Sequence, residues 1–190
     1  TLLYLPAIVS PVIIAALFRF VFDAERGPLA DGALAIGAEP IPWLQDPHWV
    51  IPAYVIMSLW TVGSQMLVFL AGLAAVDNSR IEAALIDGAS VWRRFWHVTL
   101  PALAPVFLFN LVVGTVSALQ IFAQAFVMTQ GGPGNASRFL VLYLYESGFV
   151  HLDMGYSSAI AWAIVAVAAG FTTFLMLASR RLVHYAGSTS

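Results

Sequence analysis

Neutral polar side chains stand inside otherwise apolar stretches of the sequence, and they are the first candidates for chemistry. Ser117, Gln120 and Gln124 follow one another at spacings of three and four residues, which places them on one face of a continuous helix. Asn110 lies one heptad before Ser117. Amide and hydroxyl groups can hydrogen-bond the hydroxyls of an uncharged solute, so this face is a candidate solute path.

A second polar group lies in another apolar stretch. Trp60 and Ser64 are four residues apart and share a helical face, with Gln65 beside it. An indole ring can stack on the C–H-rich face of a sugar. The alternative for both groups is hydrogen bonding between helices, which is worth about 1 kcal/mol or less per pair. The candidate solute path consists of Trp60, Ser64, Gln65, Asn110, Ser117, Gln120 and Gln124.

The composition excludes several other chemistries. The chain has no cysteine, so it has no disulfide and no thiolate metal site. It has no lysine, whereas the phosphate-binding loop of many ATPases requires Gly-Lys-Ser/Thr, so an ATP-hydrolysing site must belong to another chain. The four histidines are scattered, and a net charge of −2 does not suit a nucleic-acid binder. We therefore predict no enzyme activity, no metal, no cofactor held by this chain and no nucleic-acid partner.

The elements that hold these residues are predicted to be membrane-spanning helices. The chain is 61% hydrophobic and 9% charged, with a mean hydropathy of +0.87, whereas soluble domains carry about 25% charged residues. Each charge-free stretch can hold a span of about 20 residues. We predict an all-α, polytopic transmembrane bundle that forms a single domain over residues 1–190. Its four spans are expected at about 2–22, 50–76, 102–127 and 155–179.

The arginines predict the orientation of these spans. Arginines concentrate in residues 77–101 and in the tail 180–190, which two spans separate and which therefore lie on one side. The excess of positive charge on cytoplasmic loops places both regions in the cytoplasm. Residues 23–49 and 128–154 then lie outside. The arginines in the two cytoplasmic regions are Arg80, Arg93, Arg94, Arg180 and Arg181, against Arg19, Arg26 and Arg138 elsewhere.

Residues 77–101 predict two short helices joined by a glycine turn. Ser79 and Glu82 have the spacing of a capping box, and Gly88 can end the first helix in a left-handed conformation. Ser90 can cap the second helix, and Pro101 fits the first turn of the next span. The apolar residues of this hairpin require a partner surface: Ile81, Leu85, Val91, Trp92, Phe95 and Trp96.

Three motifs in the chain resemble those of one transporter family. The run EAALIDGASVWRRFWHVTLPALAP from Glu82 is similar to the EAA loop of ATP-binding-cassette (ABC) importer permeases of the carbohydrate-uptake branch. Residues 128–133, Met-Thr-Gln-Gly-Gly-Pro, resemble an outer loop of the maltose-transporter-like first permease subunit, and residues 155–159 resemble the start of its last span. The resemblance covers essentially the whole chain and implies that an N-terminal portion with further spans precedes it.

The resemblance implies that the hairpin is a coupling helix for a separate ATPase. By comparison with the motif, the coupling residues are Glu82, Ala83, Ala84, Asp87, Gly88, Leu100 and Pro101. A competing interpretation is that Glu82 only caps its own helix. The implied partners are two ATP-binding subunits, a second homologous permease subunit, an extracytoplasmic solute-binding protein and membrane lipid.

The implied function is uptake of a sugar or sugar-like solute across the plasma (inner) membrane of a prokaryote. The alternative is a secondary, ion-coupled membrane transporter. Such proteins usually place an Asp, Glu or Lys inside the membrane, and the four predicted spans contain none.

Overall fold

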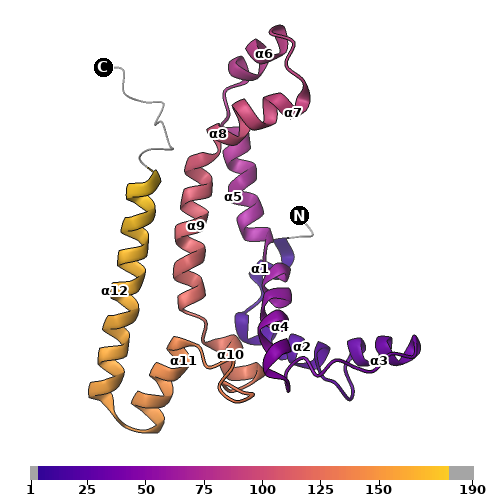
Figure 1. The fold of residues 1–190 in the computed structure, drawn as a ribbon, viewed down its shortest axis with the longest axis vertical. Coiled ribbons are helices and arrows are strands. Elements are labelled where there is room, and N and C mark those ends of the chain that lie inside the picture. Colours follow the sequence, from indigo (N-terminus) through magenta and orange to yellow (C-terminus); the bar gives the residue numbers. More distant parts are fainter. Residues whose placement is uncertain (1–3, 180–190) are drawn as a thin grey trace. The chain divides into compact units, whose positions relative to one another are not determined.

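The computed structural model describes residues 4–179, and within that range every regular element is helical (Figure 1). This confirms the predicted all-α class. The chain divides into two compact units, Thr1–Gly63 with Ser117–Ala166 and Ser64–Val116 with Val167–Ser190.

The first unit begins with four helices that start at or next to prolines. They are α1 (Leu5–Ile8), α2 (Pro11–Val21), α3 (Pro28–Ala35) and α4 (Pro47–Trp60). Proline suits the first turn because the N–H that it lacks would have no partner there. The Asp46 carboxylate caps α4 by accepting the His48 backbone N–H at 2.7 Å, and this bond lowers the pKa of Asp46. The unit continues with α10 (Ala123–Met128), α11 (Leu140–Tyr145), the π-helical turn η3 (Glu146–Val150) and the start of α12 (Met154–Ser179).

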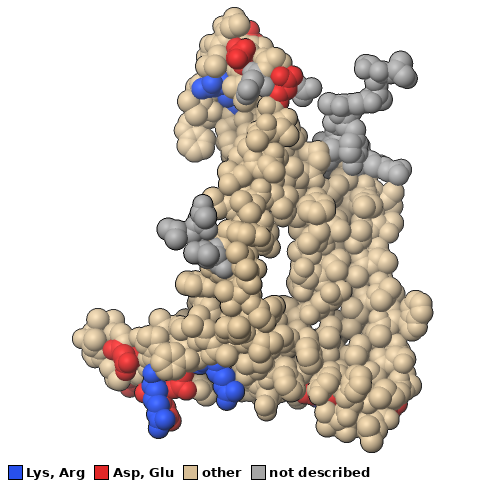
Figure 2. Space-filling model, turned by 180° about the vertical axis from the view of Figure 1, so that it is seen from behind, with Lys and Arg blue, Asp and Glu red and all other residues tan. Residues whose placement is uncertain are grey.

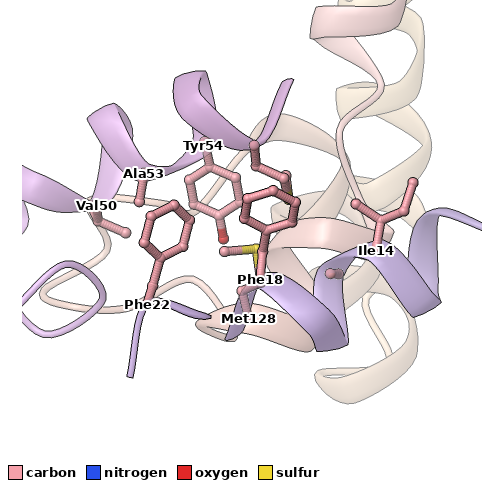
Figure 3. Packing of buried hydrophobic residues seen from close by; sticks show 9 residues of the cluster. Ile14, Phe18, Phe22, Val50, Ala53, Tyr54 and Met128 are labelled. Carbon is pink, nitrogen blue, oxygen red and sulfur yellow. The ribbon is translucent and has the colours of Figure 1, made fainter. Parts of the chain in front are cut away.

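The core of the first unit lies between α2, α4 and α10. On α4 the buried residues recur at the three- and four-residue spacing of one helical face, and they point toward the aromatic rings on and just after α2 (Figure 3). The Arg19 side chain adds a hydrogen bond from α2 to the Val127 carbonyl of α10 at 3.2 Å. The cluster consists of Ile14, Ala15, Phe18, Phe22, Val50, Ala53, Tyr54, Met57 and Met128.

The second unit pairs α5 (Gly63–Ala74) with α9 (Ala104–Leu119). A Cβ atom on Gly72 would lie 2.7 Å from Cγ2 of Val106, so the absence of a side chain at Gly72 allows this close approach. The rings of Phe69 and Phe107 also pack, with centroids 4.7 Å apart. Along the chain, α5 and α9 are connected by α6 (Asn78–Ile86), α7 (Val91–Arg94), the π-helical turn η2 (Phe95–Thr99) and α8 (Leu100–Ala102).

The predicted spans are more broken than the sequence suggested. Within the described residues, Met154–Ser179 is long and apolar enough to span a membrane alone, and its bounds coincide with the span predicted at 155–179. Two further spans meet the criteria only if a bent pair counts as one: Pro47–Trp60 with Gly63–Ala74, and Val91–Ala102 with Ala104–Leu119, the latter bent by 59°. In the segment predicted at 2–22, the longest described helix is Pro11–Val21.

The segments predicted to lie outside contain helices that were not predicted from the sequence. Residues 23–49 contain α3, and residues 128–154 contain the apolar stretch Leu140–Val150 formed by α11 and η3. The apolar run from Phe139 to Tyr145 is the sequence feature that indicates the helix in the second of these segments.

Candidate functional site

The first helix of the hairpin is capped by a different residue from the one predicted. The Asp77 carboxylate accepts the Ser79 backbone N–H at 2.9 Å, so Asp77 is the N-cap and α6 begins at Asn78. Glu82 then lies five residues after the cap, beyond the position from which a capping-box side chain reaches back. The capping box was therefore wrong, and the interpretation that Glu82 only caps its own helix loses its basis.

The end of α6 agrees with the prediction for Gly88. Gly88 has φ +73°, its N–H donates to the Leu85 carbonyl at 3.0 Å, and the Ala89 N–H donates to the Ala84 carbonyl at 3.0 Å. These two bonds form a Schellman motif, which satisfies carbonyls that a helix end otherwise leaves unpaired. The turn after α6 is thus fixed by backbone hydrogen bonds.

The second part of the hairpin is one continuous helical stretch that includes Pro101. Ser90 caps it as predicted, since its hydroxyl accepts the Arg93 N–H at 3.4 Å. The backbone stays helical from Val91 through the π-helical turn to Ala102, and the break falls at Leu103. The prediction that Pro101 opens the next membrane helix was therefore wrong. A wide turn before Pro101 accommodates a ring that a regular α-turn excludes.

The hairpin presents both its motif residues and large apolar side chains at its surface. Ile86 and Trp92 are 87% and 74% exposed. Figure 2 shows acidic and basic side chains gathered on the hairpin. Glu82 is exposed and makes no side-chain hydrogen bond or ion pair with another described residue. Of the predicted coupling residues, Ala84 and Leu100 are half-buried, whereas Glu82, Ala83, Asp87, Gly88 and Pro101 are exposed.

The polar residues of the predicted third span do not share one helical face. Helix α9 ends at Leu119, and α10 begins at Ala123, so Ser117 and Gln124 lie on different helices with Gln120 at the break. Helical spacing does not hold across such a break, and the predicted common face was wrong. The Asn110 amide donates to the Val106 carbonyl of its own helix at 3.0 Å.

The second polar group is divided in the same way. Trp60 ends α4, and Ser64 lies in the first turn of α5, so the common face predicted for them was also wrong. The Trp60 ring packs edge-on against Phe18 with centroids 5.9 Å apart. The Ser64 hydroxyl donates to Oε1 of Gln65 at 3.0 Å.

The loop after α10 contains a cluster of buried and half-buried hydroxyl groups that was not predicted from the sequence. Thr129 Oγ1 lies 2.9 Å from the Tyr54 hydroxyl and 2.6 Å from Ser137 Oγ. The Ser137 hydroxyl is buried and donates to the Gly132 carbonyl at 2.5 Å. These bonds hold the Gly-Gly-Pro turn against α4. The spacing of the Gly-Gly-Pro sequence does not indicate that Tyr54 of α4 contacts this turn, and the fold shows it.

The match to a protein family decides the identity of the chain. Residues 1–185 match the family described as "binding-protein-dependent transport system inner membrane component". The chain belongs to this family. It is therefore a membrane component of a transport system and not an enzyme, and family membership does not support the alternative of a secondary transporter.

Relatives of this transport component are permease proteins. It is 37% identical to the probable ABC transporter permease protein YesP of Bacillus subtilis, over 97% of this chain and 61% of that protein. It is 36% identical to the lactose transport system permease protein LacF of Rhizobium radiobacter, over 95% of this chain and 62% of that protein. The chain thus spans about three fifths of the length of these relatives.

The fold of this transport component matches a solved transporter. A chain in the crystal structure of a bacterial alginate ABC transporter, in complex with an alginate pentasaccharide-bound periplasmic protein, superposes with a TM-score of 0.85. The two chains are 25% identical, and the match covers 95% of this chain and 64% of the other. The resemblance inferred from the EAA motif is confirmed.

Proposed function

We propose that this chain is the membrane-spanning permease portion of an ABC importer that moves an uncharged sugar or sugar-like solute into the cytoplasm. The observation that carries the proposal is the hairpin at residues 77–101. It has a short helix with a fixed end, an acidic side chain that pairs with no other described residue, and exposed apolar residues. In a member of this family, such a surface suits docking on a separate ATP-binding subunit.

The hairpin geometry supports transmission of movement. A packed helix with a Schellman end transmits displacement better than a flexible loop, because its backbone bonds fix its shape. The stretch Val91–Ala102 follows directly and meets α9 at the Leu103 break. Closure of the ATPase subunits would thereby move a helix that runs into the membrane.

The breaks in the helices support the proposed solute path. Irregular backbone at membrane depth is tolerated where it is buried in protein or lines a water-filled cavity. One break follows Trp60, and the other includes Gln120. Two of the predicted solute-path residues, Trp60 and Gln120, therefore lie at or next to a stretch of irregular backbone.

An uncharged carbohydrate fits the charges of the chain best. A phosphorylated or acidic solute favours basic residues along its path, and the middle of each predicted span has none. Relatives have names that refer to lactose, arabinooligosaccharides and sn-glycerol-3-phosphate. The first two of these agree with the charge argument.

The proposed assembly contains four kinds of component around this chain. Two ATP-binding subunits supply ATP hydrolysis, a second homologous permease completes the pathway, an extracytoplasmic solute-binding protein delivers cargo, and lipid surrounds the spans. The chain crosses a prokaryotic plasma membrane several times, with the hairpin and the C-terminal tail in the cytoplasm. The arginine distribution and the family description support this arrangement.

Transport by the purified assembly tests the proposal. The full-length permease is isolated with its associated subunits, reconstituted in proteoliposomes, and assayed for uptake of labelled lactose and maltose with and without ATP. Uptake that requires ATP and the solute-binding protein is expected. Sugar uptake that is unchanged when ATP is omitted would overturn the proposal.

Gln120→Leu is expected to raise the half-saturating solute concentration for uptake several-fold, because one net hydrogen bond is worth about 1 kcal/mol. Subunit assembly is measured by size-exclusion chromatography and should be unchanged. Gln45→Leu, which replaces an amide in the loop before α4, is the matched control. Uptake kinetics identical to those of the unmodified protein would remove Gln120 from the solute path.

A further inference from the structure

A cleft of about 480 Å³ lies within the first unit, between the loop after α10 and the helical stretch Leu140–Val150. Its volume falls in the range of about 300–1,000 Å³ that is typical of small-molecule sites. Apart from Phe126, the residues that line the cleft belong to the segment 128–154, which the arginine distribution places outside. The described lining includes none of the predicted coupling or solute-path residues.

The charged groups in this cleft neutralise each other. The Arg138 guanidinium forms an ion pair with the Glu146 carboxylate, its Nε donating to Oε2 at 2.5 Å, and it also lies over the Tyr143 ring at 4.7 Å. Both side chains of the pair are largely shielded, at 28% and 22% exposure. The net field in the cleft therefore favours neither an anion nor a cation, whereas the outer lone pairs and N–H groups of the pair can still bind hydroxyls.

Two amide side chains line the same cleft from strained backbone positions. Gln130 has φ +51° and Asn135 has φ +68°. Asparagine tolerates this region, but it is uncommon for glutamine. Neither amide has a hydrogen-bond partner among the described residues. Residues with positive φ whose side chains line a cleft and offer free hydrogen-bonding groups are frequent at binding sites.

The surrounding structure holds these residues in place. The hydroxyl cluster of Thr129 and Ser137 fixes the loop between Gln130 and Asn135. On the opposite side, the π-helical turn Glu146–Val150 places Glu146 and His151 on the cleft lining, and π-turns are frequent at functional sites. The cleft is thus formed largely by backbone that departs from regular helix.

Two aromatic rings also line the cleft. The rings of Phe126 and Tyr145 pack edge to face, with centroids 5.7 Å apart, and both line the cavity. Aromatic rings next to amides and a neutralised ion pair offer C–H stacking together with hydrogen bonds to several hydroxyls. That combination matches an uncharged ring with hydroxyl groups and gives a charged solute no net attraction.

The geometry points to a saccharide-binding subsite in this cleft, which takes one or two rings of an uncharged sugar. The inference rests on the proposed function for the class of ligand, and it adds a binding position on the loop side of the first unit, separate from the helix breaks. A sugar would accept hydrogen bonds from Gln130, Asn135 and Arg138, donate to Glu146, and stack on the exposed part of the aromatic pair.

Protection of a single introduced thiol tests the subsite directly. Residues 1–190 contain no cysteine, so His151→Cys places a unique thiol on the cleft lining after any cysteine elsewhere in the full-length protein has been replaced. The rate of maleimide modification is measured in nanodiscs with and without maltose or lactose. At ten times the dissociation constant, the sugar is expected to slow modification about tenfold. The matched control is His48→Cys, at an exposed histidine of the same unit outside the cleft, which should react equally with and without sugar.

A double variant, Gln130→Gly with Asn135→Gly, tests which groups bind. Glycine adopts positive φ without strain, so these changes remove the amides and leave the loop conformation available. When the double variant is combined with His151→Cys, protection of the introduced thiol by sugar should fall by a factor of about ten. The thermal unfolding temperature should be unchanged. Equal protection with and without the amides would overturn the subsite, as would an absence of protection by both sugars.

The thiol assay and the uptake assay separate the two proposals. ATP-driven uptake without thiol protection would leave the importer function standing and overturn the subsite. Thiol protection without ATP-driven uptake would leave the subsite standing and overturn the importer function. Failure of both assays would overturn both proposals.

Discussion

Full-length permease carrying Gly88→Pro is expected to lose ATP-driven uptake by about tenfold or more while its partner ATPase continues to hydrolyse ATP. Gly88 has φ +73° and donates its N–H to Leu85, whereas proline fixes φ near −65° and has no N–H. The Schellman motif cannot form, so the end of α6 loses its shape. Uptake and phosphate release are measured on the same proteoliposomes, and their ratio reports coupling.

Gly37→Pro is the matched control for this prediction. Gly37 has φ +75° and donates its N–H to Leu34, and a Cβ atom at this position would meet nothing within 4 Å. The local damage is therefore of the same kind, but it falls after α3 in the predicted outer segment. Gly37→Pro should retain the normal ratio of uptake to hydrolysis. An equal loss of coupling in both variants would show that the effect is not specific to the hairpin.

Glu82→Lys provides an independent approach to the same surface. Because Glu82 is exposed and has no side-chain partner in the described part of the chain, reversing its charge should leave α6 folded. A loss of coupling would then come from the contact with the ATPase subunit. Normal coupled uptake by both Glu82→Lys and Gly88→Pro would reject the docking role of the hairpin.

Gly27→Ala is expected to give the largest loss of stability, about 2–3 kcal/mol in the free energy of unfolding. A Cβ atom at Gly27 would lie 2.5, 2.7 and 2.8 Å from the carbonyl oxygens of Asp23, Phe20 and Val21. These are backbone atoms at the end of α2, so relief requires movement of the helix end and not of a flexible side chain. The expected result is a lower midpoint in detergent-based thermal unfolding.

Gly32→Ala in the neighbouring helix is the control for Gly27→Ala. A Cβ atom at Gly32 meets nothing within 4 Å, and alanine is favoured over glycine inside a helix by up to about 1 kcal/mol. This variant should therefore be as stable as the unmodified protein or slightly more stable. A Gly27→Ala protein that unfolds at the same midpoint as Gly32→Ala would contradict the crowding argument.

Features set by local backbone chemistry could be predicted from sequence. Gly88 ends a helix and Ser90 starts one because glycine is favoured in a left-handed helix end and the first turn of a helix is stabilised by a side-chain acceptor. The cap at Asp77 was missed because both Asp77 and Ser79 can accept a backbone N–H. The direction of the backbone after α5 decides which of the two residues becomes the N-cap, and this direction cannot be predicted from the spacing of residue types.

Helix breaks were missed for a related reason. Hydropathy counts apolar residues, and the stretches around Thr61 and Gln120 remain apolar where the helix stops. The cleft could not be predicted either, since Arg138 meets Glu146 only through the fold of the segment between them, and Tyr54 meets Thr129 across 75 residues. Long-range pairs of this kind follow from the fold.

The π-helical turn at Phe95–Thr99 has a consequence for the direction of the hairpin surface. Such a turn contains about one residue more than an α-turn, and one residue of an α-helix corresponds to a rotation of about 100°. Compared with a regular α-helix, the side chains of Val91 and Trp92 are therefore rotated by that amount about the helix axis relative to Leu100. Deletion of one residue from this turn would therefore turn the exposed Trp92 side chain to a different side of the hairpin. The motif residues Glu82, Ala83, Ala84 and Gly88 would remain in the sequence.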